Sequence, residues 1–129
     1  MADDIDLWEA HAGWWQDGFT DGVDPEYTEQ ILPLAADLLH GYARVLDVGT
    51  GEGQVARLAV DGGAELAIGV DPTSNQVVEA ARRGGGPAYA RSGASHLPFA
   101  SSSFDAVIAC LVFEHIEAVD KAIAEVARV

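Results

Sequence analysis

Short continuous hydrophobic runs alternate along the chain with stretches whose apolar residues are spaced as on one face of a helix. The runs at 45–48 and 66–70 have the β-branched and bulky side chains of parallel strands that are buried on both faces. Between these runs, residues 54–60 have apolar residues at helical spacing, and Gly62-Gly63 ends that stretch. The pattern predicts a strand, a helix and a second strand parallel to the first.

The same alternation continues toward the C-terminus. Thr73, followed three residues later by Gln76, has the spacing of a capping box and predicts a helix through Ala81. Residues 87–91 predict a third strand, and the strongly apolar run 104–112 predicts a central fourth strand. A last helix is predicted over 117–129, with these apolar residues facing inward: Val119, Ile123, Val126 and Ala127. The order of elements predicts an α/β fold, a Rossmann-like, doubly wound parallel sheet with helices on both faces.

Residues 1–43 differ from the rest, because they hold ten acidic residues and no lysine or arginine. Asp24-Pro25 is a favourable helix start, Pro33 should kink this helix and Gly41 should end it. Its predicted apolar face holds Tyr27, Ile31, Leu34 and Leu38. Trp14 and Trp15 cannot both face the core from one helix, so we expect at least one to line a groove or lid; ordinary packing against the sheet is the alternative.

A glycine turn joins the first strand to the following helix. Glycines 49, 51 and 53 follow Asp47, and Asp71 ends the second strand. Glycines lack a Cβ, so the backbone can pass close to a ligand and present N–H groups at a helix N-terminus. An acid at the tip of the second strand can accept hydrogen bonds from a ribose diol. A dinucleotide fingerprint starting at Gly49 would need its third glycine at position 54, where the chain has Gln54.

With Asp47 before it, this turn resembles motif I of the class I S-adenosylmethionine-dependent methyltransferases. Further stretches resemble the type 11 group of that family, which includes ubiquinone and menaquinone methyltransferase-like proteins: residues 45–59, 69–83, 94–107 and 110–129. The resemblance implies a sheet of order 3-2-1-4, an N-terminal helical lid over 1–43 and a cofactor-binding core over 44–129. Relatives continue beyond the last helix into further strands, so we expect a C-terminally truncated fragment or a partner chain that covers the fourth strand. A 129-residue chain should then self-associate through that strand.

The resemblance also implies which residues contact S-adenosylmethionine. The glycine turn would surround the methionine and ribose parts, Asp71 would hold the ribose hydroxyls, and the lid would add tryptophans and Tyr27. The full implied set is Asp47, Gly49, Thr50, Gly51, Gly53, Asp71, Pro72, Gln76, Ala94, Ser95, Cys110, Leu111, Trp14 and Trp15. Relatives usually carry an acid just before the residue that matches Ala94, where it accepts from the adenine amino group. This chain has Gly93 there.

Catalysis in this family needs few side chains, because the sulfonium methyl group is already activated and the site mainly aligns a nucleophile with it. Glu114 and His115 follow the fourth strand and are the candidate acid–base groups, with histidine the natural proton acceptor near neutral pH. The alternative is that His115 only hydrogen-bonds a neighbouring loop. The other histidines are scattered and Cys110 is the single cysteine, so we expect no metal site.

Charge narrows the choice of substrate. The formal net charge is −14, from 21 acidic and 7 basic residues, and such a surface repels nucleic acids and anionic membranes. The chain has neither a long apolar run nor the basic start of a secretory signal, so we expect a cytoplasmic protein. The favoured function is methyl transfer to a small molecule. The alternatives are a non-catalytic S-adenosylmethionine-binding module and an NAD-type oxidoreductase, which Gln54 disfavours.

Overall fold

The protein is described by a computed structural model that covers Glu9, Ala10, Ala12 and residues 25–129. A four-stranded parallel sheet contains β1 (Arg44–Val48), β2 (Leu66–Asp71), β3 (Ala88–Arg91) and β4 (Ala106–Ile108). Its order is β3-β2-β1-β4, which confirms the predicted topology. Asp47 of β1 lies opposite Gly69 of β2 and Ile108 of β4.

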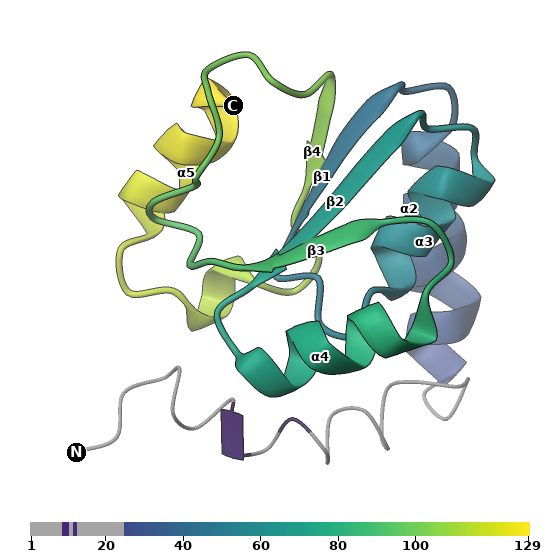
Figure 1. The fold of residues 1–129 in the computed structure, drawn as a ribbon, viewed down its shortest axis with the longest axis horizontal. Helices are drawn as coiled ribbons and strands as arrows, with labels where there is room; N and C mark the ends of the chain where they lie inside the picture. Colours follow the sequence, from purple (N-terminus) through teal and green to yellow (C-terminus); the bar gives the residue numbers. More distant parts are fainter. Residues whose placement is uncertain (1–8, 11, 13–24) are drawn as a thin grey trace.

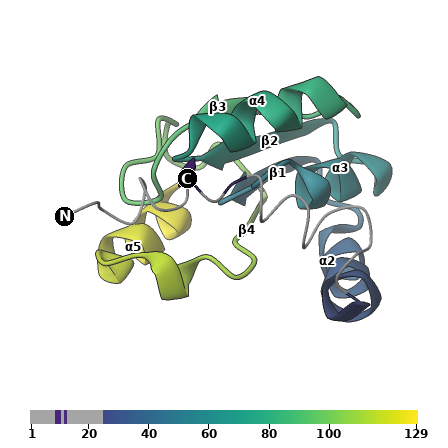
Figure 2. The ribbon, with the colours of Figure 1, turned by 90° about the horizontal axis from the view of Figure 1, so that it is seen from below.

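Helices cover both faces of this sheet (Figures 1 and 2). On one side lie α2 (Leu32–Leu39) and α3 (Gln54–Asp61), and on the other lies α5 (Val119–Arg128). The remaining long helix, α4 (Ser74–Arg83), packs on β2 and β3 beside α3, and Arg83 in its last turn pairs with Glu52 at 3.9 Å. No helix of the described residues is long and apolar enough to cross a membrane.

The strand side chains alternate between two apolar clusters, one on each face. Val45 and Ala67 pack with α2 and α3, whereas Leu46, Val48 and Val70 pack with the end of α5 and the loop before β4. Because alternate residues share a face, Asp47 points to the same side as Val45, and Asp71 to the same side as Ala67. The two carboxylates therefore share the α3 face of the sheet.

In the helical segment before β1, the buried face lies one residue further along the chain than predicted. It begins with a π-helical turn, η1 (Tyr27–Ile31), in which the Leu32 N–H donates to the Tyr27 carbonyl five residues earlier. A π turn takes up one residue more than an α turn, so the buried positions move one residue along the chain. Ala35 and Leu39 are buried, while Leu34 and Leu38 of the predicted face are exposed. The predicted end is confirmed, since Gly41 follows α2 with φ +88°.

The predicted fourth strand was too long. The Phe104 N–H donates to the Val129 carbonyl rather than to a strand, and the Asp105 carboxylate accepts from the N–H groups of Ala43 and Arg44. At the other end Leu111 has φ +57°, which is incompatible with a strand. Pairing with β1 is therefore confined to three residues of β4.

The inward face predicted for the last helix was only partly right. Ala122 and Val129 are buried and Val126 is half-buried, but Ala127 is exposed and Ile123 is 50% exposed. These residues follow helical spacing, and Val126 and Val129 pack in the cluster around Leu46, whereas Ile123 lies on the neighbouring face of the helix. The helix begins at Val119, two residues later than predicted.

Candidate functional site

The glycine turn is shaped by contacts within the chain. Its first N–H groups, those of Gly49 and Thr50, both donate to the Val70 carbonyl at 2.8 and 2.9 Å. Gly49 and Gly53 have φ values of +71° and +94°, which L-residues rarely adopt. A Cβ at Gly49 would lie 2.3 Å from a Val112 methyl carbon, and one at Gly53 would lie 2.2 Å from the Tyr89 hydroxyl oxygen. Backbone conformation and internal packing thus both require these two glycines.

Asp71 links the glycine turn to the start of α4. One carboxylate oxygen accepts from the Gly51 N–H at 3.0 Å. The other accepts from the N–H and the hydroxyl of Thr73, at 3.0 and 2.7 Å. The carboxylate is buried, and three bonds leave about one of its acceptor positions for a ligand hydroxyl.

Thr73 consequently does not form the predicted capping box. Its hydroxyl is committed to Asp71 and makes no bond to the helix backbone. The N–H groups of Ser74 and Asn75 instead donate to the two carboxylate oxygens of Glu9, at 2.7 and 2.8 Å. A carboxylate from distant sequence therefore caps α4, next to the residues that Asp71 holds.

Asp47 is the most deeply buried acid of the site, with only 2% of its surface exposed. It accepts a 2.7 Å hydrogen bond from the Thr50 hydroxyl, and the Thr50 side chain fills the space above Gly69. Burial raises the pKa of Asp47 to about 7; the hydrogen bond from Thr50 opposes this shift and the nearby charge of Asp71 adds to it. This carboxyl group can therefore change its charge near neutral pH.

A hollow of about 30 Å³ lies above the glycine turn. It brings together five residues of the predicted set: Asp47, Gly49, Thr50, Gly51 and Cys110. Burial raises the pKa of Tyr27 far above its usual value and that of Cys110 to about 11, so both are neutral at physiological pH. The hollow is thus small.

Sequence reasoning missed Glu52, Gln54 and Val55, which also line this hollow, whereas Tyr27 was expected there. Glu52 is 4% exposed although it lies between two glycines of the turn. An acid inside the motif is the signal that could have identified it. With Asp47 and Asp71, it gives the turn three buried carboxylates.

The other predicted residues lie around this centre. Pro72 and buried Gln76 lie at the start of α4, and half-buried Ala94 and Ser95 belong to the loop after β3. Leu111 follows Cys110 in a left-handed conformation and is 43% exposed. Gly53 ends the turn. Trp14 and Trp15 lie outside the described residues.

Glu114 and His115 belong to η2 (Phe113–His115), the short 3₁₀-helix that follows β4. Both side chains are exposed, and His115 Nε2 lies 3.7 Å from Glu114 Oε1. Neither is among the residues that line the hollow. The part of the chain that the structure describes contains no group of three or more His, Cys, Asp or Glu residues that could hold a metal ion.

The electrostatics of the turn distinguish between ligand classes. The buried acids Asp47, Glu52 and Asp71 beside the helix N-terminus of α3 oppose a pyrophosphate, because each one that is ionised would lie close to a like charge. They favour a ligand that carries positive charge and hydroxyl groups. The arrangement thus disfavours a dinucleotide.

A family model described as a methyltransferase domain matches residues 46–129. The chain belongs to the class I S-adenosylmethionine-dependent methyltransferase family. S-adenosylmethionine is the cofactor of this family. Its sulfonium and ammonium charges and its ribose diol are chemically complementary to the buried acids of the glycine turn, which are hydrogen-bond acceptors.

Similar proteins agree with this assignment. The chain is 31% identical over 87 residues to a malonyl-[acyl-carrier protein] O-methyltransferase of Enterobacter lignolyticus (strain SCF1), covering 67% of this chain and 34% of that protein. It is 32% identical to the Bacillus subtilis YcgJ protein, with a TM-score of 0.71, covering 78% of this chain and 45% of that one. The fold also matches the Synechocystis PCC 6803 magnesium protoporphyrin IX methyltransferase ChlM with bound SAH, at a TM-score of 0.76 and 22% identity, over 95% of this chain and 64% of that one. The chain spans between about a third and two thirds of these proteins.

Proposed function

We propose that this chain binds S-adenosylmethionine at the glycine turn and serves the transfer of its methyl group to a small-molecule acceptor. The observation that carries the proposal is the placement of Asp47 and Asp71 on one face of the sheet, on either side of a turn of glycines.

Each part of the cofactor has a proposed set of contacts. Asp47, the turn and the end of β4 would hold the methionine part, and Asp71 would accept from a ribose hydroxyl. Pro72 and the loop after β3 would flank the adenine, with Gln76 beneath. These assignments cover Asp47, Gly49, Thr50, Gly51, Gly53, Asp71, Pro72, Gln76, Ala94, Ser95, Cys110 and Leu111. Trp14, Trp15 and Tyr27 would contribute from the N-terminal segment.

When bound, the cofactor supplies an electrophilic methyl group on a sulfonium sulfur. The chain's own residues bind and orient the cofactor and exclude water. Proximity and desolvation then accelerate the methyl transfer. An oxygen or nitrogen acceptor loses a proton as it gains the methyl group. We propose that His115 accepts that proton, with Glu114 Oε1 3.7 Å from its Nε2 to stabilise the imidazolium that forms.

Calorimetric titration with S-adenosylmethionine, S-adenosylhomocysteine and NAD tests the proposal. We expect both sulfur ligands to bind and NAD not to bind. Asp71→Ala should weaken S-adenosylhomocysteine binding by about 1.5–3 kcal/mol, the scale of a hydrogen bond to a charged group. Asp61→Ala is the matched control, because it removes an exposed acid at the far end of α3.

Binding of NAD in place of the sulfur ligands would contradict the proposal. Binding of S-adenosylhomocysteine by Asp71→Ala with the parent's affinity would locate the ribose elsewhere. Asp71→Asn separates the structural role of this residue from its proposed role in ligand binding, since an amide oxygen can still accept from the Gly51 N–H or the Thr73 N–H.

A further inference from the structure

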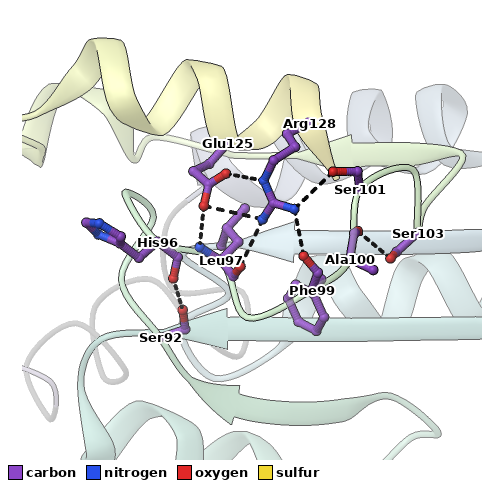
Figure 3. Close-up of polar contacts among 9 residues, drawn as sticks. All are labelled: Ser92, His96, Leu97, Phe99, Ala100, Ser101, Ser103, Glu125 and Arg128. Carbon is purple, nitrogen blue, oxygen red and sulfur yellow. Dashed lines mark hydrogen bonds and ion pairs between the residues drawn. The ribbon is translucent and has the colours of Figure 1, made fainter.

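The loop between β3 and β4 carries Ala94 and Ser95 and is held in place by the end of α5 (Figure 3). Hydrogen bonds between loop and helix run over residues 97–104 on one side and 125–129 on the other. Ten or more residues without helix or strand would ordinarily be a variable segment. Here the polar contacts fix the path of the backbone.

Arg128 makes most of the side-chain contacts to this loop. Its Nη2 donates to the Leu97 carbonyl at 3.0 Å, and its Nη1 donates to the Phe99 carbonyl at 2.8 Å and to the Ser101 hydroxyl at 3.4 Å. Nε donates to Glu125. The planar guanidinium has fixed donor directions, so the three acceptors in the loop fix the position of the loop relative to the guanidinium.

Glu125 completes the arrangement from one turn earlier in the helix. Its Oε1 accepts from the Leu97 N–H at 3.0 Å. Both backbone groups of Leu97 are thus held by the Glu125–Arg128 pair, as Figure 3 shows. Backbone hydrogen bonds also join the loop to the end of the helix. The N–H groups of Ser102 and Phe104 donate to the carbonyls of Arg128 and Val129, at 2.8 and 2.9 Å.

Apolar contacts fix the same loop from beneath. The Leu97 side chain is only 5% exposed and packs with Leu46 and Val129. The rings of Phe99 and Phe104 meet edge to face, with their centroids 5.1 Å apart. Glu125 and Arg128 therefore contact a loop that is already packed on one side, and their hydrogen bonds select one backbone arrangement of that loop.

The loop also continues directly into the cofactor side of the sheet. The Ser92 N–H donates to the Asp71 carbonyl at 3.0 Å, and the Ser92 hydroxyl donates to the His96 carbonyl at 3.3 Å. Ala94 and Ser95 span the short stretch between Ser92, fixed at β2, and Leu97, fixed at α5. A change at Leu97 must alter the backbone of this stretch, because only a few residues separate its two fixed ends.

We propose that Arg128 is a positioning residue for the adenosine side of the cofactor site, acting from the opposite face of the sheet through Leu97 and Phe99. The inference rests on the proposed function, since it takes the loop of Ala94 and Ser95 as the adenine contact. Without Arg128 the loop samples several arrangements, and a ligand that binds only one of them keeps an affinity in proportion to the population of that arrangement.

The test compares Arg128→Ala and Arg128→Lys with Arg82→Ala. Arg82 is a matched control, because it also pairs with a glutamate three residues earlier, at 2.6 Å, and it is 69% exposed on α4. Lysine keeps the positive charge near the helix C-terminus but has one compact charge in place of the fork. If the alanine variant does not fold, the lysine variant and Glu125→Gln carry the comparison.

Two ligands provide a readout that a general loss of stability does not move. S-adenosylhomocysteine and S-inosylhomocysteine differ only at one edge of the base, where the 6-amino group becomes a carbonyl oxygen and N1 gains a hydrogen. We expect both Arg128 variants to bind S-adenosylhomocysteine roughly tenfold more weakly, a change of about 1.4 kcal/mol, and to lose discrimination between the two ligands. The Leu97 amide should exchange its hydrogen faster in both variants, and Arg82→Ala should match the parent throughout.

The possible failures are distinguishable. A parent chain that does not bind S-adenosylhomocysteine overturns the proposed function, and this inference with it. A parent that binds while both Arg128 variants bind equally well overturns this inference alone. An equal loss for both ligands, with discrimination unchanged, or a parent that does not discriminate between them, also overturns it.

Discussion

Asp47 shows how a single buried carboxyl group links stability to function. Its pKa of about 7 in the folded chain, set first by burial, lies above the value of about 3.9 for the unfolded chain. Between these values the folded state holds one proton more than the unfolded state. The free energy of unfolding therefore falls as the pH rises from about 4 to about 7, and this contribution is constant at higher pH.

Asp47→Asn should remove this penalty. We expect the variant to be more stable than the parent above pH 7, by about 2 to 4 kcal/mol, and the difference to vanish near pH 4. The amide oxygen can still accept from the Thr50 hydroxyl. Urea unfolding across that pH range measures the slope. Parallel pH profiles for the two proteins would mean that Asp47 stays ionised throughout.

Gly93 stands where the family resemblance predicts an acid, and it offers a gain of function. A Cβ at this position would meet no atom within 4 Å, and Gly93 is not among the glycines with positive φ. Gly93→Asp should therefore fit and should strengthen S-adenosylhomocysteine binding by about 1.5–3 kcal/mol through a bond to the adenine amino group. Titration of Gly93→Ala controls for backbone stiffening. An aspartate variant that binds no better than the alanine variant would place the adenine elsewhere.

At the scale of single residues the sequence predicted the glycine turn but not its contacts. The turn could be predicted because three glycines follow the first apolar run at close spacing. Their neighbours Val112 and Tyr89 lie about 60 and 36 residues away, beyond the range of any local pattern. The burial that shifts the pKa of Asp47 has the same origin, since it depends on how the whole site closes.

At the scale of elements, α4 depends on a residue from the N-terminal segment. The Glu9 carboxylate accepts from the N–H groups of Ser74 and Asn75 and lies where the helix dipole favours negative charge. Glu9→Ala should cost about 1 kcal/mol of stability, and Glu9→Gln should cost less because one acceptor remains. Urea unfolding measures both, with exposed Glu65→Ala as the control. Unchanged stability in both Glu9 variants would show that water caps this helix equally well.

Elements were predicted well where one local signal decided them. Continuous apolar runs located β1 and β2 almost to the residue, because both strands are buried on both faces. The α2 face was displaced by one residue because a π turn has no spacing signature of its own. The cap of α4 was wrong because the competing acceptors, Asp71 and Glu9, are brought to Thr73 and Ser74 only by the fold.

At the scale of the whole molecule, the sheet has an open edge among the described residues. β4 pairs only with β1, and two apolar side chains that follow it in the chain, Leu111 and Ile123, are 43% and 50% exposed. An unpaired strand edge with apolar neighbours is a template for association. The three-residue length of β4 and the net charge of −14 on each copy both oppose it.

These opposing effects make self-association depend on salt. At low ionic strength the repulsion between acidic copies should keep the 129-residue chain monomeric, and at about 0.5 M salt, where screening shortens its range, dimers should form through β4 and α5. Ile123→Glu should abolish the dimer, because it places a charge on the apolar face, while Val78→Glu, at a 67% exposed position on α4, should not. Sedimentation velocity at both salt concentrations measures the mass. A chain that stays monomeric in high salt would show that a short edge strand is sufficient protection, and a dimer that survives Ile123→Glu would place the contact on another face.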